Sequence, residues 1–138
     1  MDGKDIIREF TVCGNHVTVH VPAHCAGEAR PDAAEGRSGE TSPALPDSLP
    51  AVYLHVHDGD GSEVLQLCRE LGYREFVLAA IRPRCWNDDL TPWECPGLFA
   101  DDAPFAGKAA EQLRLLESQI IPRVEGSAPR KPEQRVLA

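Results

Sequence analysis

The sequence predicts an α/β fold in which a β-hairpin precedes a mostly parallel sheet flanked by helices. Three patterns predict it: apolar alternation on both sides of a Gly-Asn turn, two near-continuous apolar runs separated by a helical period, and a second amphipathic helix further along the chain. The length of 138 residues fits one domain, since domains most often contain about 100–150 residues. We therefore expect a single α/β domain over residues 1–138.

The first predicted element is a β-hairpin between Ile6 and Val21. Apolar residues recur at every second position on both arms, and Cys13-Gly14-Asn15 lies between the arms. Residues 26–50, in contrast, are rich in Pro, Gly, Ser and acidic side chains and have no apolar period. They predict a long flexible loop between the hairpin and the rest of the domain.

A β-α-β unit is predicted next. Ala51–His57 is mostly apolar and rich in strand-forming residues, and it ends at the Gly-rich turn 58–61. From Ser62, the expected N-cap, apolar residues recur at helical spacing until Gly72, and a second apolar run covers Phe76–Ile81. Near-continuous apolar strands joined by a helix are typical of a parallel sheet with a right-handed crossover and both faces covered.

The last third of the chain predicts a loop, a helix and the beginning of a strand. Residues 82–107 form a long irregular stretch with both tryptophans, and such loops tend to be functional. Lys108–Val124 has the apolar period of an amphipathic helix, which Pro122 should kink or end. Arg135–Ala138 then predicts the first residues of another strand. Because strands usually contain about five or six residues, this ending predicts a truncated domain.

Charge and composition exclude several classes of partner. A net charge of −8 argues against nucleic acid, because backbone phosphates are bound mainly by basic patches. No apolar run approaches the roughly 18 residues of a membrane-spanning helix, and the first residues are too polar for a secretory signal. We expect a soluble, cytoplasmic protein without a membrane partner. Its five cysteines form no C-x-x-C pair and predict reduced thiols.

One string of residues is specific enough to indicate a family. Trp86-Asn87-Asp88-Asp89-Leu90-Thr91-Pro92-Trp93 follows the second apolar run, and Pro104–Ala109 begins the helix that reaches Ile120-Ile121-Pro122. With the preceding strand, the Asp58-Gly59 turn and the helix, this order resembles the esterase branch of the α/β-hydrolases, the enterochelin-esterase and feruloyl-esterase-like serine hydrolases. The resemblance covers about residues 51–138 and implies the N-terminal portion of an α/β-hydrolase fold.

The resemblance implies which parts of an ester-hydrolysing site this chain contains. In the family, the strand that corresponds to Arg135–Ala138 leads into a G-x-S-x-G turn with the nucleophilic serine, and the acid and the histidine follow it. The sequence ends before that turn, so no catalytic residue is assigned, and the chain alone is expected not to cleave the small-molecule ester. Two sets of site residues are implied: the oxyanion-hole donors Gly59 and Asp60, and the substrate-rim residues Trp86, Asn87 and Trp93.

The histidines do not predict a metal or cofactor site. His16 and His20 share one face of a predicted strand, as do His55 and His57, so each pair can approach one ion. No carboxylate or thiol stands at a spacing that completes a set of ligands. His24 lies outside both pairs. Surface and strand-edge histidines are the simpler explanation, and no metal and no cofactor are predicted.

Other reactive side chains also have an ordinary structural explanation. Cys85 and Cys95 flank the tryptophan loop, but a catalytic thiol needs a histidine partner. Ser62 lacks the second glycine of a nucleophile turn, so a helix cap explains it better. Asp88 and Asp89 are adjacent and so tend to diverge, which favours turn-forming carboxylates over an acid and base pair. The tryptophans fit a pocket rim and a buried plug equally well.

Two functions therefore stay open. The first is a carboxylic-ester hydrolase of the serine-esterase type, of which this chain is the N-terminal part. The second is a non-catalytic interaction domain, completed by a second copy or by a partner strand. The second rests on the exposed sheet edge expected at Arg135–Ala138, because an unpaired edge is a template for strand addition.

Overall fold

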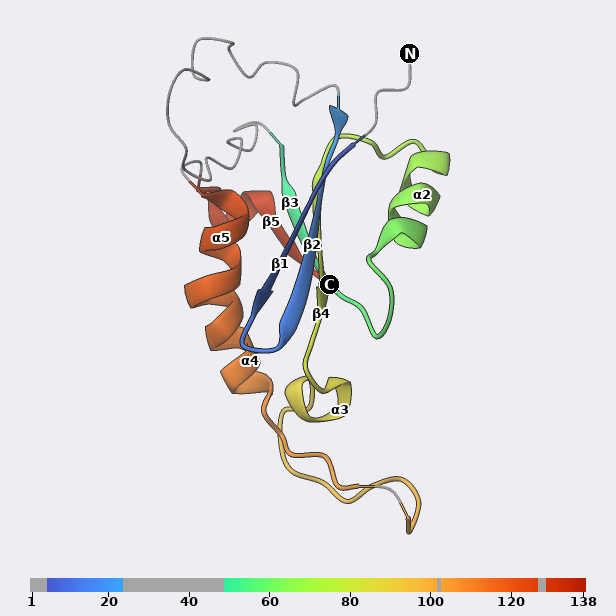
Figure 1. Cartoon of the computed structure of the whole chain (residues 1–138), viewed down its shortest axis with the longest axis vertical. Coiled ribbons are helices and arrows are strands. Elements are labelled where there is room, and N and C mark those ends of the chain that lie inside the picture. The colour runs from blue at the N-terminus through green and yellow to red at the C-terminus, as the bar shows by residue number, and fades with distance from the viewer. Residues whose placement is uncertain (1–4, 24–48, 102, 127–128) are drawn as a thin grey trace.

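The computed structural model describes residues 5–23, 49–101, 103–126 and 129–138. Its five-stranded sheet has the order β1-β2-β4-β3-β5 (Figure 1). The strands are β1 Ile6–Val12, β2 Asn15–Val21, β3 Ala51–His55, β4 Val77–Arg82 and β5 Arg135–Leu137. The helical segments are α2 Ser62–Glu70, α3 Trp86–Asp89, α4 Ala109–Leu115, η2 Leu116–Ile120, α5 Ile121–Glu125 and η3 Pro132–Gln134. Apart from its last two residues, the loop expected at 26–50 lies outside the described residues.

The predicted hairpin is confirmed. Strands β1 and β2 pair antiparallel from Ile6 opposite Val21 to Val12 opposite Asn15. The two residues between them, Cys13 and Gly14, both have positive φ, as a tight hairpin turn requires. Strand β2 then pairs antiparallel with β4, which joins the hairpin to the rest of the sheet.

The predicted parallel unit is confirmed as well. Strand β3 runs parallel to β4, with Val52 opposite Leu78, and α2 connects them. Strand β5 runs parallel to β3 on its other side, so the final apolar residues do form a strand. Its side chains are half exposed, 49 % for Val136 and 55 % for Leu137. Strand β3 is shorter than expected, because it ends at His55 and leaves His57 in the following turn.

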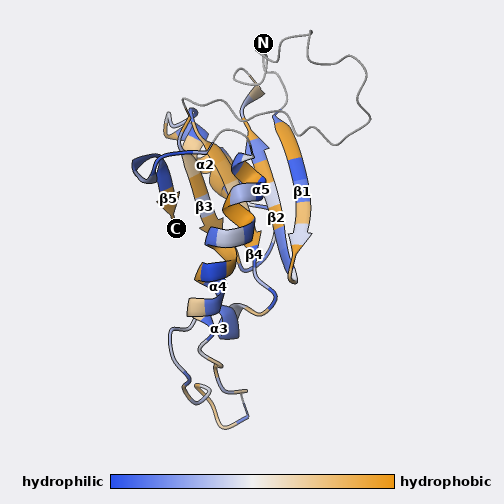
Figure 2. Cartoon of the chain, turned by 90° about the vertical axis from the view of Figure 1, so that its left-hand side faces the viewer, coloured by the Kyte–Doolittle hydropathy of each residue, from blue (hydrophilic) through white to orange (hydrophobic). Residues whose placement is uncertain are grey.

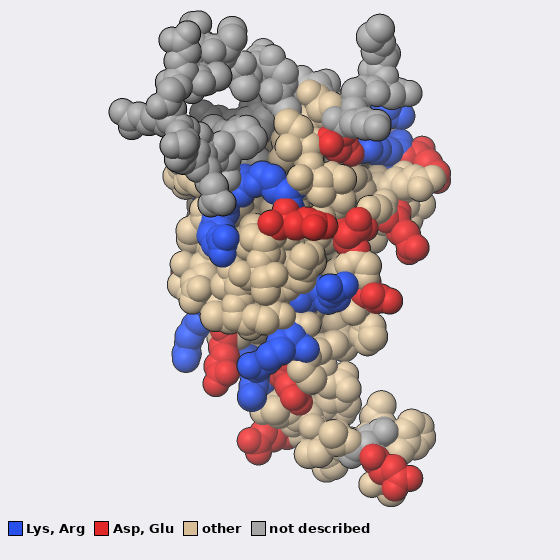
Figure 3. Space-filling model, viewed as in Figure 1, with Lys and Arg blue, Asp and Glu red and all other residues tan. Residues whose placement is uncertain are grey.

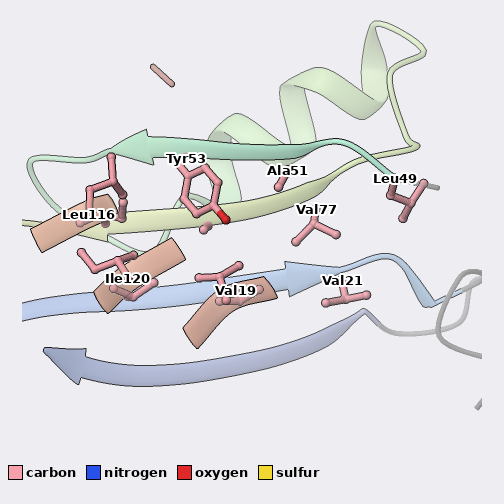
Figure 4. Packing of buried hydrophobic residues seen from close by; sticks show 12 residues of the cluster. Val19, Val21, Leu49, Ala51, Tyr53, Val77, Leu116 and Ile120 are labelled. Atoms are coloured by element: carbon pink, nitrogen blue, oxygen red, sulfur yellow. The ribbon is translucent and has the colours of Figure 1, made fainter. Parts of the chain in front are cut away.

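Helices cover the sheet from both sides. Figure 1 shows the sheet nearly edge-on, with α2 on one side and α4 with α5 on the other. Side chains alternate between the two faces, and the face toward α4 and α5 holds the main core. In Figure 4, Leu116 and Ile120 of the helix point toward Val19 and Tyr53 of the sheet. In Figure 2 hydrophilic and hydrophobic residues alternate along this helix in front of the largely apolar strands, and its buried residues Leu116, Ile120 and Val124 belong to the core.

Pro122 was expected to kink or end the last helix, and the prediction that the helix ends there is wrong. The helix continues to Glu125, and the segment before the proline, Leu116–Ile120, is π-helical. Proline lacks an N–H, and its ring collides with the carbonyl four residues earlier. The wider turn, in which the Ile121 N–H donates to the Leu116 carbonyl, accommodates the ring without breaking the helix.

Acidic residues outnumber basic ones, with 22 Asp and Glu against 14 Lys and Arg. Figure 3 shows lysine and arginine intermixed with aspartate and glutamate on the visible face. None of the helices in the described part of the chain combines the length and the apolar character needed to cross a membrane.

Candidate functional site

The loops that follow β3 and β4 meet at the carboxyl ends of these parallel strands. His57, in the first loop, lies edge-on to Trp86 at the start of α3, with 5.4 Å between the ring centroids. Ligands of open α/β sheets bind outside the carboxyl ends of the strands. This contact therefore brings the implied oxyanion loop and one implied rim residue together at the edge of the sheet where a site is expected.

Asp60 organises the turn that leads into α2. Its carboxylate accepts hydrogen bonds from the Ser62 N–H at 3.0 Å and from the Ser62 hydroxyl at 2.5 Å. The hydrogen bonds from Ser62 lower the pKa of Asp60. The expectation that Ser62 is the N-cap is wrong, because the cap position is Gly61 and Ser62 is the first helical residue. The side chain of Asp60 thus performs the capping function that was expected of Ser62.

The implied oxyanion donor Gly59 already has an acceptor within its own loop. Its N–H donates to Asp58 Oδ1 at 2.9 Å, and its φ of 78° is in the region that favours glycine. Both residues are exposed. A substrate oxygen that uses this N–H must displace the Asp58 carboxylate.

The same loop is held firmly against the sheet behind it. The buried His20 of β2 donates through Nε2 to the Asp60 carbonyl at 2.7 Å. Gly61 has a φ of 83°, and a Cβ there would lie 2.8 Å from the Cβ of Ala80 on β4. Only glycine fits such an approach. The hairpin and β4 therefore fix the position of the residues next to the candidate donors.

Asp88 and Asp89 are structural. The buried Asp89 carboxylate accepts the Cys85 N–H at 3.0 Å, and Asp88 accepts the Ala106 N–H at 3.0 Å. The hydrogen bond from Ala106, followed by one from the Cys85 thiol, lowers the pKa of Asp88. The Cys85 thiol thus donates to a carboxylate and not to a histidine, the partner that a catalytic thiol needs.

The implied rim residues occupy different places. Trp86 is 37 % exposed beside His57, and the neighbouring Asn87 is exposed, with its carbonyl accepting the Thr91 hydroxyl at 2.8 Å. Trp93 is 69 % exposed on a projecting arm. There its backbone packs so tightly on Gly107 that a Cβ at the glycine would lie 2.4 Å from the Trp93 carbonyl carbon. The structure therefore brings Trp86, and not Trp93, to the His57 side of the site.

A buried polar network behind the site was not predicted. Gln112 of α4 donates to Asn15 Oδ1 at 2.9 Å and lies 3.4 Å from Nε2 of His55. Burial lowers the pKa of His55, and a backbone hydrogen bond to Ala138 offsets part of this effect. One feature of the sequence indicates this network, because Gln112 is a polar residue on the apolar stripe of its helix. Among the described residues, no group of three His, Cys, Asp or Glu side chains can hold a metal ion.

A buried carboxylate anchors β5 at its amino end, away from these loops. Glu125 accepts the Tyr53 hydroxyl at 2.6 Å and a bidentate pair of bonds from Arg135, each 2.9 Å long. Burial alone raises the pKa of Glu125, but the hydrogen bonds from Arg135, Tyr53 and the Arg130 N–H outweigh burial and lower it. Burial, followed by the bond to Glu125, raises the pKa of Tyr53. These contacts hold the short β5 against β3.

The other face of the sheet has an open apolar groove of about 710 Å³. It lies between α2 and β5, and Val52, Leu54 and Val136 form its floor. Gly59, Asp60, Trp86 and Trp93 do not line it. The groove is therefore a feature separate from the candidate site.

Comparison with known proteins gives a likeness of fold. No protein-family model and no curated protein sequence matches the chain. The structure is similar to the BES protein from Bacillus cereus, with a TM-score of 0.56 and 12 % identity over 99 % of this chain and 53 % of that one. It is also similar to the enterobactin and salmochelin hydrolase IroE, with a TM-score of 0.52 and 19 % identity over 96 % of this chain and 50 % of that one. At such identities the likeness shows an α/β fold shared with these two proteins and nothing finer. The chain spans about half the length of both structures.

Proposed function

We propose that this chain is the N-terminal part of a carboxylic-ester hydrolase of the serine-esterase type. The observation that carries the proposal is the sheet order β1-β2-β4-β3-β5 with a Gly-rich turn after β3, in a chain that covers half of a structure named as a hydrolase. In the proposed enzyme, β5 leads into the nucleophile turn, and the acid and histidine follow it. This part supplies the loop with Gly59 and Asp60 and the Trp86 side of the substrate rim.

The proposed role of the Gly59 loop is to hold a backbone N–H near the developing oxyanion. Such donors stabilise negative charge most when the protein fixes their position before the reaction. The hydrogen bond from His20 and the close approach of Gly61 to Ala80 provide that fixation here. Trp86, which is 37 % exposed beside His57, offers apolar surface to the ester.

The test is a pair of ester-hydrolysis assays. The purified 138-residue chain is incubated with a chromogenic short-chain ester and should show no turnover above buffer. A longer protein in which the strand continues into a G-x-S-x-G turn should hydrolyse the ester, and serine-directed inhibitor should stop it. Inhibitor-sensitive turnover by the 138-residue chain would contradict the proposal that the nucleophile, the acid and the histidine lie outside this chain. An inactive longer protein would contradict the proposed activity.

A non-catalytic interaction domain is the second candidate, and the geometry of β5 favours it. The Ala138 N–H donates to the Tyr53 carbonyl, and the Ala138 carbonyl accepts the His55 N–H. Backbone groups alternate along a strand, so those of Leu137 point to the outer edge. Leu137→Pro removes an outward N–H and should abolish strand addition while β5 stays paired with β3. Size-exclusion chromatography with light scattering decides whether the edge mediates association.

A further inference from the structure

The loop between α3 and α4 forms an arm that keeps a defined shape. The arm comprises the described residues 92–101 and 103–107 and projects beyond the sheet and its helices (Figure 1). Cys95 and Phe105 face each other across the arm and exchange two backbone hydrogen bonds of 3.2 and 2.8 Å. Gly107 packs closely on the opposite limb at the base. These contacts fix the shape of the arm before any partner binds, which lowers the entropic cost of binding.

The arm exposes large apolar side chains. Trp93, Leu98 and Phe99 are 69 %, 80 % and 74 % exposed, the three highest values among the large hydrophobic residues that the structure describes. None of the three belongs to the hydrophobic core. A single exposed apolar side chain is normal, but several on one projecting element indicate an interaction surface. Tryptophan and phenylalanine are also enriched where proteins bind proteins.

All charged residues of the arm are acidic. Glu94 and Asp101 are exposed, and the sequence has no lysine or arginine over residues 85–107. Arg84 and Lys108 flank this stretch, and both interact with carboxylates of α3. A partner that covers the apolar side chains of the arm therefore meets negative charge next to them in the chain.

We propose that the arm binds a protein segment in which lysine or arginine accompanies apolar side chains. The apolar residues of the arm supply the contact area, and Glu94 and Asp101 at its rim pair with the cations of the partner, which speeds association and selects the partner. Nucleic acid and anionic lipid are disfavoured, because their phosphates repel the carboxylates. Neutral lipid is disfavoured as well, because carboxylates beside the inserted side chains are costly to remove from water. The proposal is independent of ester hydrolysis and of strand addition at β5.

The experiment uses a synthetic amphipathic peptide of leucine and lysine as the probe and tryptophan fluorescence of the intact chain as the readout. Trp86→Phe leaves Trp93 as the only tryptophan, and its emission maximum should move to shorter wavelength as the peptide covers the ring. The shift should saturate with a dissociation constant on the order of 10 µM. In this background, Leu98→Lys should raise the dissociation constant at least about tenfold. Leu113→Lys makes the same change at a leucine of α4 that is 52 % exposed, so it is the matched control and should leave the constant unchanged.

A charge reversal tests the chemistry of the partner. Glu94→Lys combined with Asp101→Lys should weaken binding of the lysine peptide and create binding of the same peptide with glutamate in place of lysine. Vesicles of phosphatidylcholine or of phosphatidylglycerol should give no shift, and circular dichroism confirms that every variant is folded.

Four outcomes overturn the proposal. The first is no saturable shift with the lysine peptide up to about 500 µM. The second is a dissociation constant that Leu98→Lys leaves unchanged or that Leu113→Lys raises equally. The third is tighter binding to either kind of vesicle than to the peptide, which would make the arm a lipid-binding element. The fourth is a shift that appears when the protein concentration alone is raised, because the arm then binds a second copy.

Discussion

The two faces of the sheet differ in how completely they are covered. On the side of α4 and α5, Ile120, Val124 and Tyr53 are at most 1 % exposed, and a hydrogen-bonded ion pair closes the end of the helix. On the side of α2, the groove stays open beside Leu67 and Leu71. The first face holds the interactions that stabilise this chain by itself. The second face leaves apolar side chains exposed and contributes less to the stability of the single chain.

The largest expected effect is the loss of the buried ion pair on the covered face. Glu125→Gln removes the charge that pairs with Arg135 and that accepts the Tyr53 hydroxyl, and breaking a buried pair from one side costs about 3–5 kcal/mol. Urea unfolding at neutral pH measures the free energy of unfolding. Glu117→Gln, on the exposed side of the same helix, is the control and should change it by less than about 0.5 kcal/mol. Equal effects would show that the cluster does not anchor β5.

A comparison of one core residue from each side should give the next largest difference. Ile120→Ala leaves a cavity in the fully buried core and should cost about 2–4 kcal/mol. Leu67→Ala on the open face should change the free energy of unfolding by less than about 0.5 kcal/mol. Both are measured by urea unfolding at low protein concentration, so that association does not contribute. A large loss for Leu67→Ala would mean that this face is already covered in the single chain.

Local patterns predicted the strands and helices well, because each lies in a consecutive stretch of sequence. Apolar alternation and the Gly-Asn turn predicted β1 and β2, and two apolar runs with a helix between them predicted the parallel pair β3 and β4. The boundaries were less accurate. Pro122 was expected to kink or end its helix, and the π-helical turn that accommodates it depends on packing that single-residue propensity does not contain.

The candidate site was predictable in outline only. The Asp-Gly turn and the tryptophan string indicated which loops matter, and the contact of His57 with Trp86 brings those loops together. The contact itself depends on where β3 and β4 end, which the sequence predicted two residues too late for β3. Likewise, the partners of Gln112 come from the hairpin and from β3, far away in the chain. Such contacts between distant segments are set by the tertiary fold.

Two glycines at opposite ends of α2 test how tightly this helix is held. Gly61→Ala forces a positive φ on alanine and places its Cβ against Ala80. We therefore expect the free energy of unfolding to fall by about 2 kcal/mol. Gly72 has a φ of 93°, and nothing lies within 4 Å of an added Cβ, so Gly72→Ala should cost only the strain, about 1 kcal/mol. The difference between the two, measured by thermal unfolding, reports the close contact alone. Equal losses would mean that α2 shifts away from β4 at little cost.

The smallest effect is a pH dependence that originates on the covered face. Burial holds the pKa of His55 below its unfolded value of about 6.5, so between these two values the unfolded chain binds more protons than the folded one. The contribution of neutral His55 to the free energy of unfolding is therefore fully present above about pH 6.5. It is lost as the pH falls through the lower pKa of the folded state. The ring is partly exposed, which keeps the effect small. Free energies of unfolding at about pH 5.5 and 7.5 should differ less in His55→Gln than in the parent, with His16→Gln as the control. If His55→Gln retains the full difference, the burial of His55 is not the source of this pH dependence.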